Sequence, residues 1–302
     1  MKKYILPVLV LGLMLLVACE GGEDPVTNGG AFIGGTDGLL ASFEPLSVLD
    51  DGVYTIFDTE DFPLEVILNN KGEQTLVAGE VTLKLLGPAK PDFDGISSWE
   101  LQNNEEIEKI SEFNPSGGEE VISFTPNAYA KYKSEVIGYT DITWNLEYDY
   151  NYKTYLIVND VCFKEDTTDP KVCTVKEAKT FSVSSAPITV TSVEEDAGGK
   201  GIILVKVAIS NAGTGQSTNP GEEFDLRFDQ VSYVIDEPEL WECKSGGREG
   251  EARLVDGTAE VICRLKEPLA EGEIYTKPVK LTFEYVYKEL IQEKLRVKES
   301  AE

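Results

Sequence analysis

Apolar and polar residues alternate along much of this chain. Between Ile142 and Tyr152, every second residue is apolar or aromatic, and the residues between them are polar. The same period of two recurs at residues 62–68, 203–209 and 279–287. Because successive side chains of a β-strand point to opposite faces of a sheet, this period predicts strands with one buried face and one face in water. Few stretches have a helical period, so we expect an all-β fold.

Two short sequence patterns occur once in each half of the chain. Residues 66–72 and 207–213 share the form V-x-[L/I]-x-N-x-G, and residues 146–150 and 283–287 share the form [L/F]-E-Y-x-Y. The offset from Asn70 to Asn211 is nearly equal to the offset from Tyr148 to Tyr285. Nearly equal offsets predict an internal repeat, with chance similarity among β-strands as the alternative.

A strand that closes with N-x-G continues into a turn, because glycine accepts positive φ and asparagine bonds to nearby backbone. Such strands resemble the immunoglobulin-like repeats of secreted prokaryotic surface proteins, including CARDB-type adhesion modules. The resemblance implies two tandem immunoglobulin-like β-sandwich domains. We place the first at residues 36–186, with a long loop at residues 87–118, and the second at residues 187–302, since Pro187 ends one alternation and a new one follows.

The N-terminus has the features of an export signal. Lys2 and Lys3 precede an uncharged apolar run at residues 5–17. This run is too short to cross a membrane, which takes about 20 residues, and it fits the apolar region of a secretory signal. It ends in Leu16-Val17-Ala18-Cys19, which resembles the lipobox of prokaryotic lipoproteins.

The lipobox resemblance implies that residues 1–18 are a cleaved signal peptide and that the thiol of Cys19 receives a diacylglyceryl group. An ordinary signal peptide with an incidental cysteine is the alternative. Residues 19–35 then comprise the lipidated cysteine and a flexible, glycine-rich tether. With the tandem domains, these features resemble surface proteins of small-genome archaea and bacteria. They predict an exported protein that its lipid anchors to the outer face of the cell envelope membrane.

The chain is strongly acidic, with 27 Lys and Arg residues against 54 Asp and Glu residues and a net charge of −27. A negative field repels nucleic acid, so we expect no DNA or RNA partner. The sequence contains no histidine, which excludes histidine-based catalytic triads and histidine metal sites. No catalytic motif lies in a convincing context, so we expect a protein that is not an enzyme and has no cofactor.

Acidic clusters at residues 50–51, 58–61 and 92–95 offer carboxylate oxygens that could bind Ca²⁺. None of them has the spacing of an EF-hand loop. We therefore interpret these clusters as solubilising surface charge and expect no metal site, with Ca²⁺ binding as the alternative.

Four cysteines follow Cys19, and an even number in an exported chain favours disulfides. Pairing within each predicted domain gives Cys162–Cys173 and Cys243–Cys263. A metal site made by four thiolates normally needs C-x-x-C pairs, which this chain lacks, and free thiols are the other alternative.

Trp99 and Trp241 lie between strand-like segments, in loop contexts where an exposed indole could stack on a sugar. They are the candidate ligand-binding residues, and a buried loop anchor is the alternative for each of them.

Three hypotheses for function remain. The first is a non-catalytic binding or adhesion module, anchored to the membrane through the lipid on Cys19, whose partners are other surface proteins or glycans. The second is a structural subunit that self-associates or joins an envelope layer through exposed strand edges. The third is a carbohydrate- or solute-binding lipoprotein with a cleft lined by Trp99 or Trp241.

Overall fold

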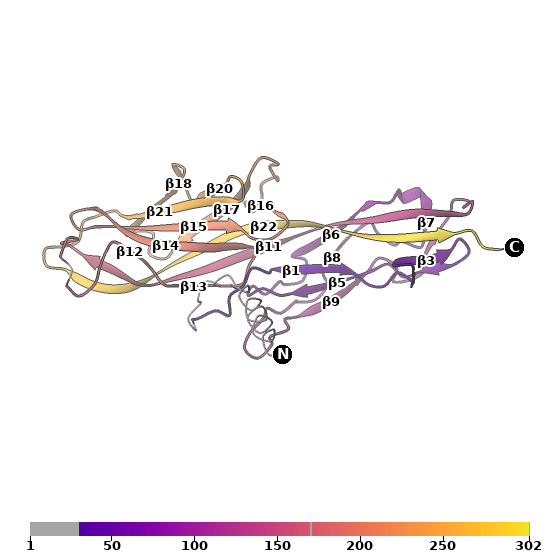
Figure 1. Cartoon of the computed structure of the whole chain (residues 1–302), viewed down its shortest axis with the longest axis horizontal. Helices are drawn as coiled ribbons and strands as arrows, with labels where there is room; N and C mark the ends of the chain where they lie inside the picture. Colours follow the sequence, from indigo (N-terminus) through magenta and orange to yellow (C-terminus); the bar gives the residue numbers. More distant parts are fainter. Residues whose placement is uncertain (1–29, 170, 302) are drawn as a thin grey trace, which may run out of the picture.

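The computed structural model describes residues 30–169 and 171–301, so the predicted signal peptide and Cys19 lie outside the described residues. The described part forms β-strands and one 3₁₀ turn, η1 (Lys90–Asp92), and it contains no α-helix (Figure 1). The predicted all-β class is therefore confirmed. The strands are β1 (Leu39–Phe43), β2 (Val48–Asp50), β3 (Val53–Phe57), β4 (Asp61–Phe62), β5 (Glu65–Asn70), β6 (Val81–Gly87), β7 (Phe93–Asp94), β8 (Glu100–Gln102), β9 (Glu119–Ser123), β10 (Ala130–Tyr132), β11 (Tyr139–Lys164), β12 (Glu177–Ala178), β13 (Phe181–Val183), β14 (Ile188–Gly199), β15 (Ile202–Asn211), β16 (Gln216–Thr218), β17 (Asp229–Ile235), β18 (Trp241–Ser245), β19 (Arg248–Glu249), β20 (Glu251–Leu254), β21 (Thr258–Leu265) and β22 (Ile274–Lys298).

Two very long strands, β11 and β22, form the axis of the molecule. They pair in antiparallel register along their whole lengths, with one irregularity between Val158 and Val161. Alternate residues of β11 from Ile142 to Val158 are buried, and this burial pattern continues past Tyr152, where the alternation of apolar and polar residues ends. A strand of 26 residues rising about 3.3 Å per residue is about 85 Å long. The molecule is accordingly elongated (Figure 1).

β11 and β22 lie at the centre of a ten-stranded sheet with the main order β2-β3-β22-β11-β6-β8. A three-stranded sheet, β1-β5-β9, covers part of its buried face, and a six-stranded sheet, β12-β14-β15-β21-β18-β19, covers another part (Figure 1). A small sheet, β4-β10-β7, closes the far end of the first layer pair, where Phe93 packs 4.8 Å from Trp144 between ring centroids. These layers share one continuous hydrophobic core.

Each layer pair uses part of both long strands. The early part of β11 pairs with β6, and its later part pairs with β13. β22 pairs with β17 in its early part and, in parallel, with β3 at its end. The expected division of the chain at residues 186 and 187 stays a prediction, and strands from both sides of that point meet in the ten-stranded sheet.

The middle of the long ladder, where Asn151 of β11 is opposite Val286 of β22, is called the waist below. In the first half of the chain, Asn70 closes β5 here. Its Oδ1 accepts hydrogen bonds from the Gly72 N–H at 3.1 Å and from Tyr152 Oη at 3.3 Å. A Cβ on Gly72 would lie 1.8 Å from Tyr152 Oη, so only glycine fits beneath this ring.

The second half of the chain repeats the arrangement at Asn211. Its Oδ1 accepts from the Gly213 N–H at 3.1 Å and from Tyr287 Oη at 2.9 Å. The same bonds in both halves support the predicted internal repeat. They match Tyr287 with Tyr152, however, and not with Tyr150 as the [L/F]-E-Y-x-Y alignment predicts. The alignment from the sequence is therefore two residues out of register with the structure. A shift of two residues keeps each side chain on the same face of its strand, so the period of two cannot reveal it.

Candidate functional site

The N-terminal segment of residues 30–36, called the docked segment below, is fastened at the waist. The backbone N–H groups of Ile33 and Gly34 donate to the two carboxylate oxygens of Glu73 at 2.9 and 3.0 Å. The N–H of Ser185 donates to the same carboxylate at 2.8 Å, and Glu73 is only 8% exposed. The chain therefore enters the fold near the middle of the long axis, beside β1 and β13 (Figure 1).

Two hollows flank the docked segment. The first, of about 500 Å³, lies between residues 30–33 and residues 109–113. The second, of about 810 Å³, lies between residues 33–36, β13 and the start of β14. Side chains of Ile33, Phe181, Val183 and Val190 line this larger hollow together with several threonines. In the described residues, β13 pairs only with β11, and the start of β14 pairs only with β15.

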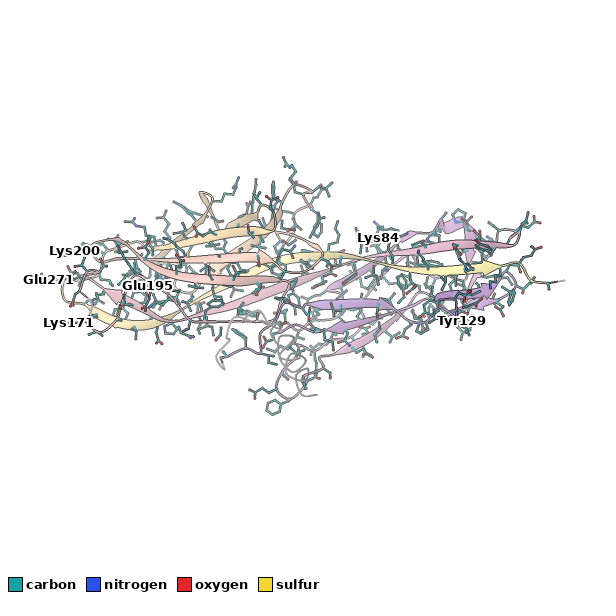
Figure 2. All side chains as sticks on the ribbon, viewed as in Figure 1. Lys84, Tyr129, Lys171, Glu195, Lys200 and Glu271 are labelled. Carbon is teal, nitrogen blue, oxygen red and sulfur yellow. A yellow bond between two sulfur atoms is a disulfide. The ribbon has the colours of Figure 1, made fainter. Side chains whose placement is uncertain are left out.

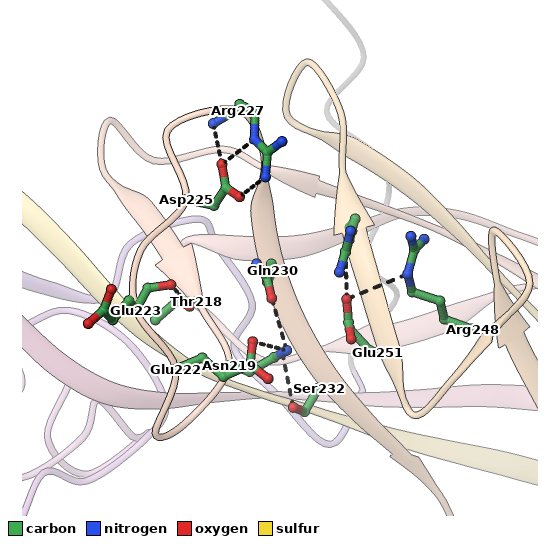
Figure 3. A network of polar contacts seen from close by, with 11 residues as sticks. Thr218, Asn219, Glu222, Glu223, Asp225, Arg227, Gln230, Ser232, Arg248 and Glu251 are labelled. Atoms are coloured by element: carbon green, nitrogen blue, oxygen red, sulfur yellow. Dashed lines mark hydrogen bonds and ion pairs between the residues drawn. The ribbon is translucent and has the colours of Figure 1, made fainter.

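The opposite long side of the molecule presents a projecting loop, residues 219–228, which joins β16 to β17. A polar network holds its base (Figure 3). The side-chain amide of Asn219 donates to Glu222 and Gln230, both at 3.2 Å, and its Oδ1 accepts from Ser232 Oγ at 3.0 Å. The loop is therefore braced against β17 by bonds that satisfy both ends of one amide.

The end of this loop and the neighbouring strand β20 form a mixed apolar and cationic surface. We call it the outer patch and define it as Leu226, Arg227 and Phe228 of the loop with Arg253 of β20. Leu226 is 88% exposed. The guanidinium carbons of Arg227 and Arg253 lie 5.3 and 4.7 Å from the centre of the Phe228 ring. Cation–π contacts of this kind order long side chains that would otherwise be mobile.

The charge of Arg227 is balanced locally. Its guanidinium donates to both carboxylate oxygens of Asp225, at 2.9 and 2.6 Å (Figure 3). Hydrogen bonding from Arg227 lowers the pKa of Asp225 to about 2. Glu251 accepts from Arg253 at 2.7 Å and lies 3.9 Å from Arg248. The outer patch therefore offers planar guanidinium groups and apolar surface with little net charge.

Sequence reasoning missed the outer patch. The sequence signal was the run Phe224-Asp225-Leu226-Arg227-Phe228, in which aromatic and cationic residues are interleaved in an otherwise acidic chain. Its exposure depends on how the loop is held away from β17, which the alternation of residues does not indicate.

The two candidate tryptophans lie far from one another in the fold. Trp241, on β18, is 3% exposed and packs 5.9 Å from Phe163, with its edge reaching two small hollows of about 190 and 260 Å³. Trp99 is half-buried in the loop before β8 and packs 6.3 Å from Trp144, against the core. The expected loop placement is wrong for Trp241, because this residue begins β18 and its indole belongs to the core. A ligand-binding role for either indole stays a prediction.

The acidic clusters form separate surface ion pairs. Asp50 contacts Lys298 at 2.6 Å, Asp94 contacts Lys133 at 3.1 Å and Asp61 contacts Lys131 at 3.6 Å. Across residues 30–169 and 171–301, no group of three or more His, Cys, Asp or Glu side chains is arranged to hold a metal ion.

Both predicted disulfides, Cys162–Cys173 and Cys243–Cys263, are present. The first closes a loop after β11, and the second joins the neighbouring strands β18 and β21.

A buried ion pair lies beside the first disulfide. Both carboxylate oxygens of Glu195 accept from the Cys162 N–H at 3.0 Å, and Lys179 Nζ lies 2.7 Å from one of them. The Glu195 side chain is fully buried, and this burial raises its pKa to about 7. Lys179 also lines the larger hollow. Figure 2 shows Glu195 toward the end of the molecule that carries Lys171, Lys200 and Glu271.

Comparison of the chain with protein-family models, with curated proteins and with solved structures finds no match. Within the described ranges, no helix has the length and apolar character needed to cross a membrane.

Proposed function

We propose that this chain is a lipid-anchored cell-surface protein that binds a partner on the outside of the cell and performs no catalysis. The anchor is the diacylglyceryl group on Cys19, and the body comprises two immunoglobulin-like sandwiches. The partner is another surface protein or a glycan, bound at the outer patch.

The observation that supports this proposal most directly is the outer patch itself. Arginine and aromatic residues are enriched among the side chains that dominate protein interfaces, and a large exposed apolar residue such as Leu226 adds contact area. The loop base is hydrogen-bonded and both guanidinium groups lie over the Phe228 ring, so the loop and its arginines lose little conformational freedom on binding. It also lies on the long side of the molecule opposite the docked segment, which leads to the anchor (Figure 1).

The anchor is tested by growing cells that express the full chain with a radiolabelled fatty acid. Label in the purified protein, lost in the Cys19→Ser variant but kept in a Cys162→Ser/Cys173→Ser variant, is the expected result. Secreted, unlabelled wild-type protein would refute lipid anchoring and favour the ordinary signal peptide.

The binding role is tested with microspheres coated with the full chain and incubated with cells and with a glycan array. We expect Leu226→Ser combined with Arg227→Glu to reduce binding at least tenfold. The matched control is Val121→Ser, which removes a half-exposed apolar side chain from β9. If both variants lose binding equally, the outer patch is not the binding site. If the wild type binds neither cells nor any glycan on the array, the binding role is refuted.

A second candidate function, self-assembly, is favoured by one feature. All three residues of β2, at the end of the ten-stranded sheet, are exposed, including Val48 and Leu49. An exposed apolar edge strand can pair with another chain. Light scattering after size exclusion, across concentration and with calcium or chelator, separates the two functions, because a constant monomer refutes assembly. Loss of concentration-dependent oligomers in Val48→Lys would assign assembly to this edge.

A further inference from the structure

We propose that the side of the waist carrying the docked segment rests on the lipid bilayer, with the Phe113 ring inserted at the boundary between the lipid headgroups and the acyl chains. This inference rests on the lipid anchor of the proposed function and adds the orientation of the molecule on the membrane.

The first support is the place where the described chain begins. Gly30 lines the 500 Å³ hollow, and only a short stretch of sequence separates it from Cys19. A stretch of about 11 residues spans at most about 40 Å when fully extended. Because Ile33 and Gly34 are bonded to Glu73, the anchor keeps this side of the waist within that distance of the membrane.

The second support is an exposed aromatic residue on the same hollow. Phe113 is 98% exposed, yet it lines this hollow together with residues 30–33. Its loop is tightly closed, since Ser111 and Asn114 exchange backbone hydrogen bonds at 3.0 and 3.1 Å. The structure therefore fixes an apolar ring at the tip of a short loop, beside the point where the chain leaves for the anchor.

A single aromatic ring binds lipid weakly when it acts alone. Here the lipid on Cys19 makes the contact intramolecular, so the local concentration of bilayer is high and a weak contact is sufficient. Ile33, which is half-exposed at the same hollow, adds apolar surface.

Charge determines which lipid surface is compatible with this contact. Glu112 adjoins Phe113, and the whole chain has a net charge of −27, so an anionic membrane repels it. We therefore expect insertion into zwitterionic lipid and weaker insertion as anionic lipid is added. In this orientation the long axis lies along the membrane, and the outer patch faces away from it (Figure 1).

The test uses the full lipidated chain reconstituted in phosphatidylcholine vesicles, with the variants Phe113→Trp and Leu226→Trp. Both positions are highly exposed, so the substitutions leave the core unchanged. The emission of the wild-type tryptophans is subtracted, and phosphatidylcholine brominated on its acyl chains serves as the quencher. We expect at least twofold quenching at position 113 and none at position 226.

Each outcome has a defined meaning. Protein that floats with the vesicles but shows no quenching at position 113, or equal quenching at both positions, overturns the orientation alone. Protein that does not float with the vesicles refutes the lipid anchor and the orientation with it.

Discussion

Tyr287 donates a hydrogen bond from its Oη to Asn211 Oδ1 at 2.9 Å, and the same Oη accepts from the Gly215 N–H at 2.9 Å. The Tyr287 ring belongs to β22, whereas Asn211 closes β15, so one hydroxyl group joins the ten-stranded sheet to the six-stranded sheet at the waist. Tyr152 and Asn70 make the corresponding contact between the ten-stranded sheet and the three-stranded sheet, at 3.3 Å.

Tyr287→Phe should lower the free energy of unfolding by about 2 kcal/mol, because it removes two part-buried hydrogen bonds, one to Asn211 Oδ1 and one from the Gly215 N–H, each worth about 1 kcal/mol. Tyr152→Phe should cost less, since its contacts are longer. Urea unfolding measures both, with the exposed Tyr139→Phe as the control. Equal and negligible effects in all three variants would contradict a structural role for these hydroxyl groups.

Glu73→Gln should loosen the docked segment. A glutamine side chain has one acceptor oxygen where three backbone N–H groups now donate to a carboxylate. Amide hydrogen exchange at Ile33, Gly34 and Ser185 should become at least tenfold faster. Glu112→Gln, in an exposed loop on the same hollow, should leave these rates unchanged. Unchanged exchange in Glu73→Gln would show that other contacts hold the segment.

Removing the Cys243–Cys263 disulfide by a double Cys→Ala substitution should reduce stability by about 3 kcal/mol in the chain-entropy model. The separation of 20 residues sets that magnitude. Cys162–Cys173, with a separation of 11 residues, should contribute slightly less. Thermal unfolding of both variants, with and without reductant, provides the measurement. If reductant lowers the unfolding temperature of the wild type by more than the two substitutions lower it together, the two disulfides do not act independently.

Glu195 should make stability depend on pH. Its pKa is raised by burial from 4.5 to about 7 in the folded chain, so between these values the folded state binds a proton that the unfolded state has lost. The stability contributed by Glu195 is therefore greatest below pH 4.5 and falls as the pH rises to about 7.

The comparison is between the wild type and Glu195→Gln, which cannot titrate. The free energy of unfolding of the wild type, relative to the variant, should decrease across this window and then level off. Glu194→Gln, at the adjacent exposed position of β14, should give no such trend. A relative stability that rises with pH would mean that pairing with Lys179 outweighs the burial of Glu195.

Much of the local structure follows from the chain alone. The period of two at residues 142–152 determines that β11 has one buried face, because adjacent side chains of a strand point in opposite directions. The turns after Asn70 and Asn211 are encoded in N-x-G, and an even set of cysteines in short loops predicted both crosslinks.

Only the tertiary structure decided how far the long strands extend and what they join. The period does not say which strands pair, so the meeting of β22 with β3, which lies near the opposite end of the described chain, has no local signal. The docking of residues 30–36 on Glu73 and the exposure of the outer patch likewise follow from the tertiary structure and not from the local pattern. Alternation is a property of neighbouring residues, whereas these contacts depend on packing between segments that are remote in sequence.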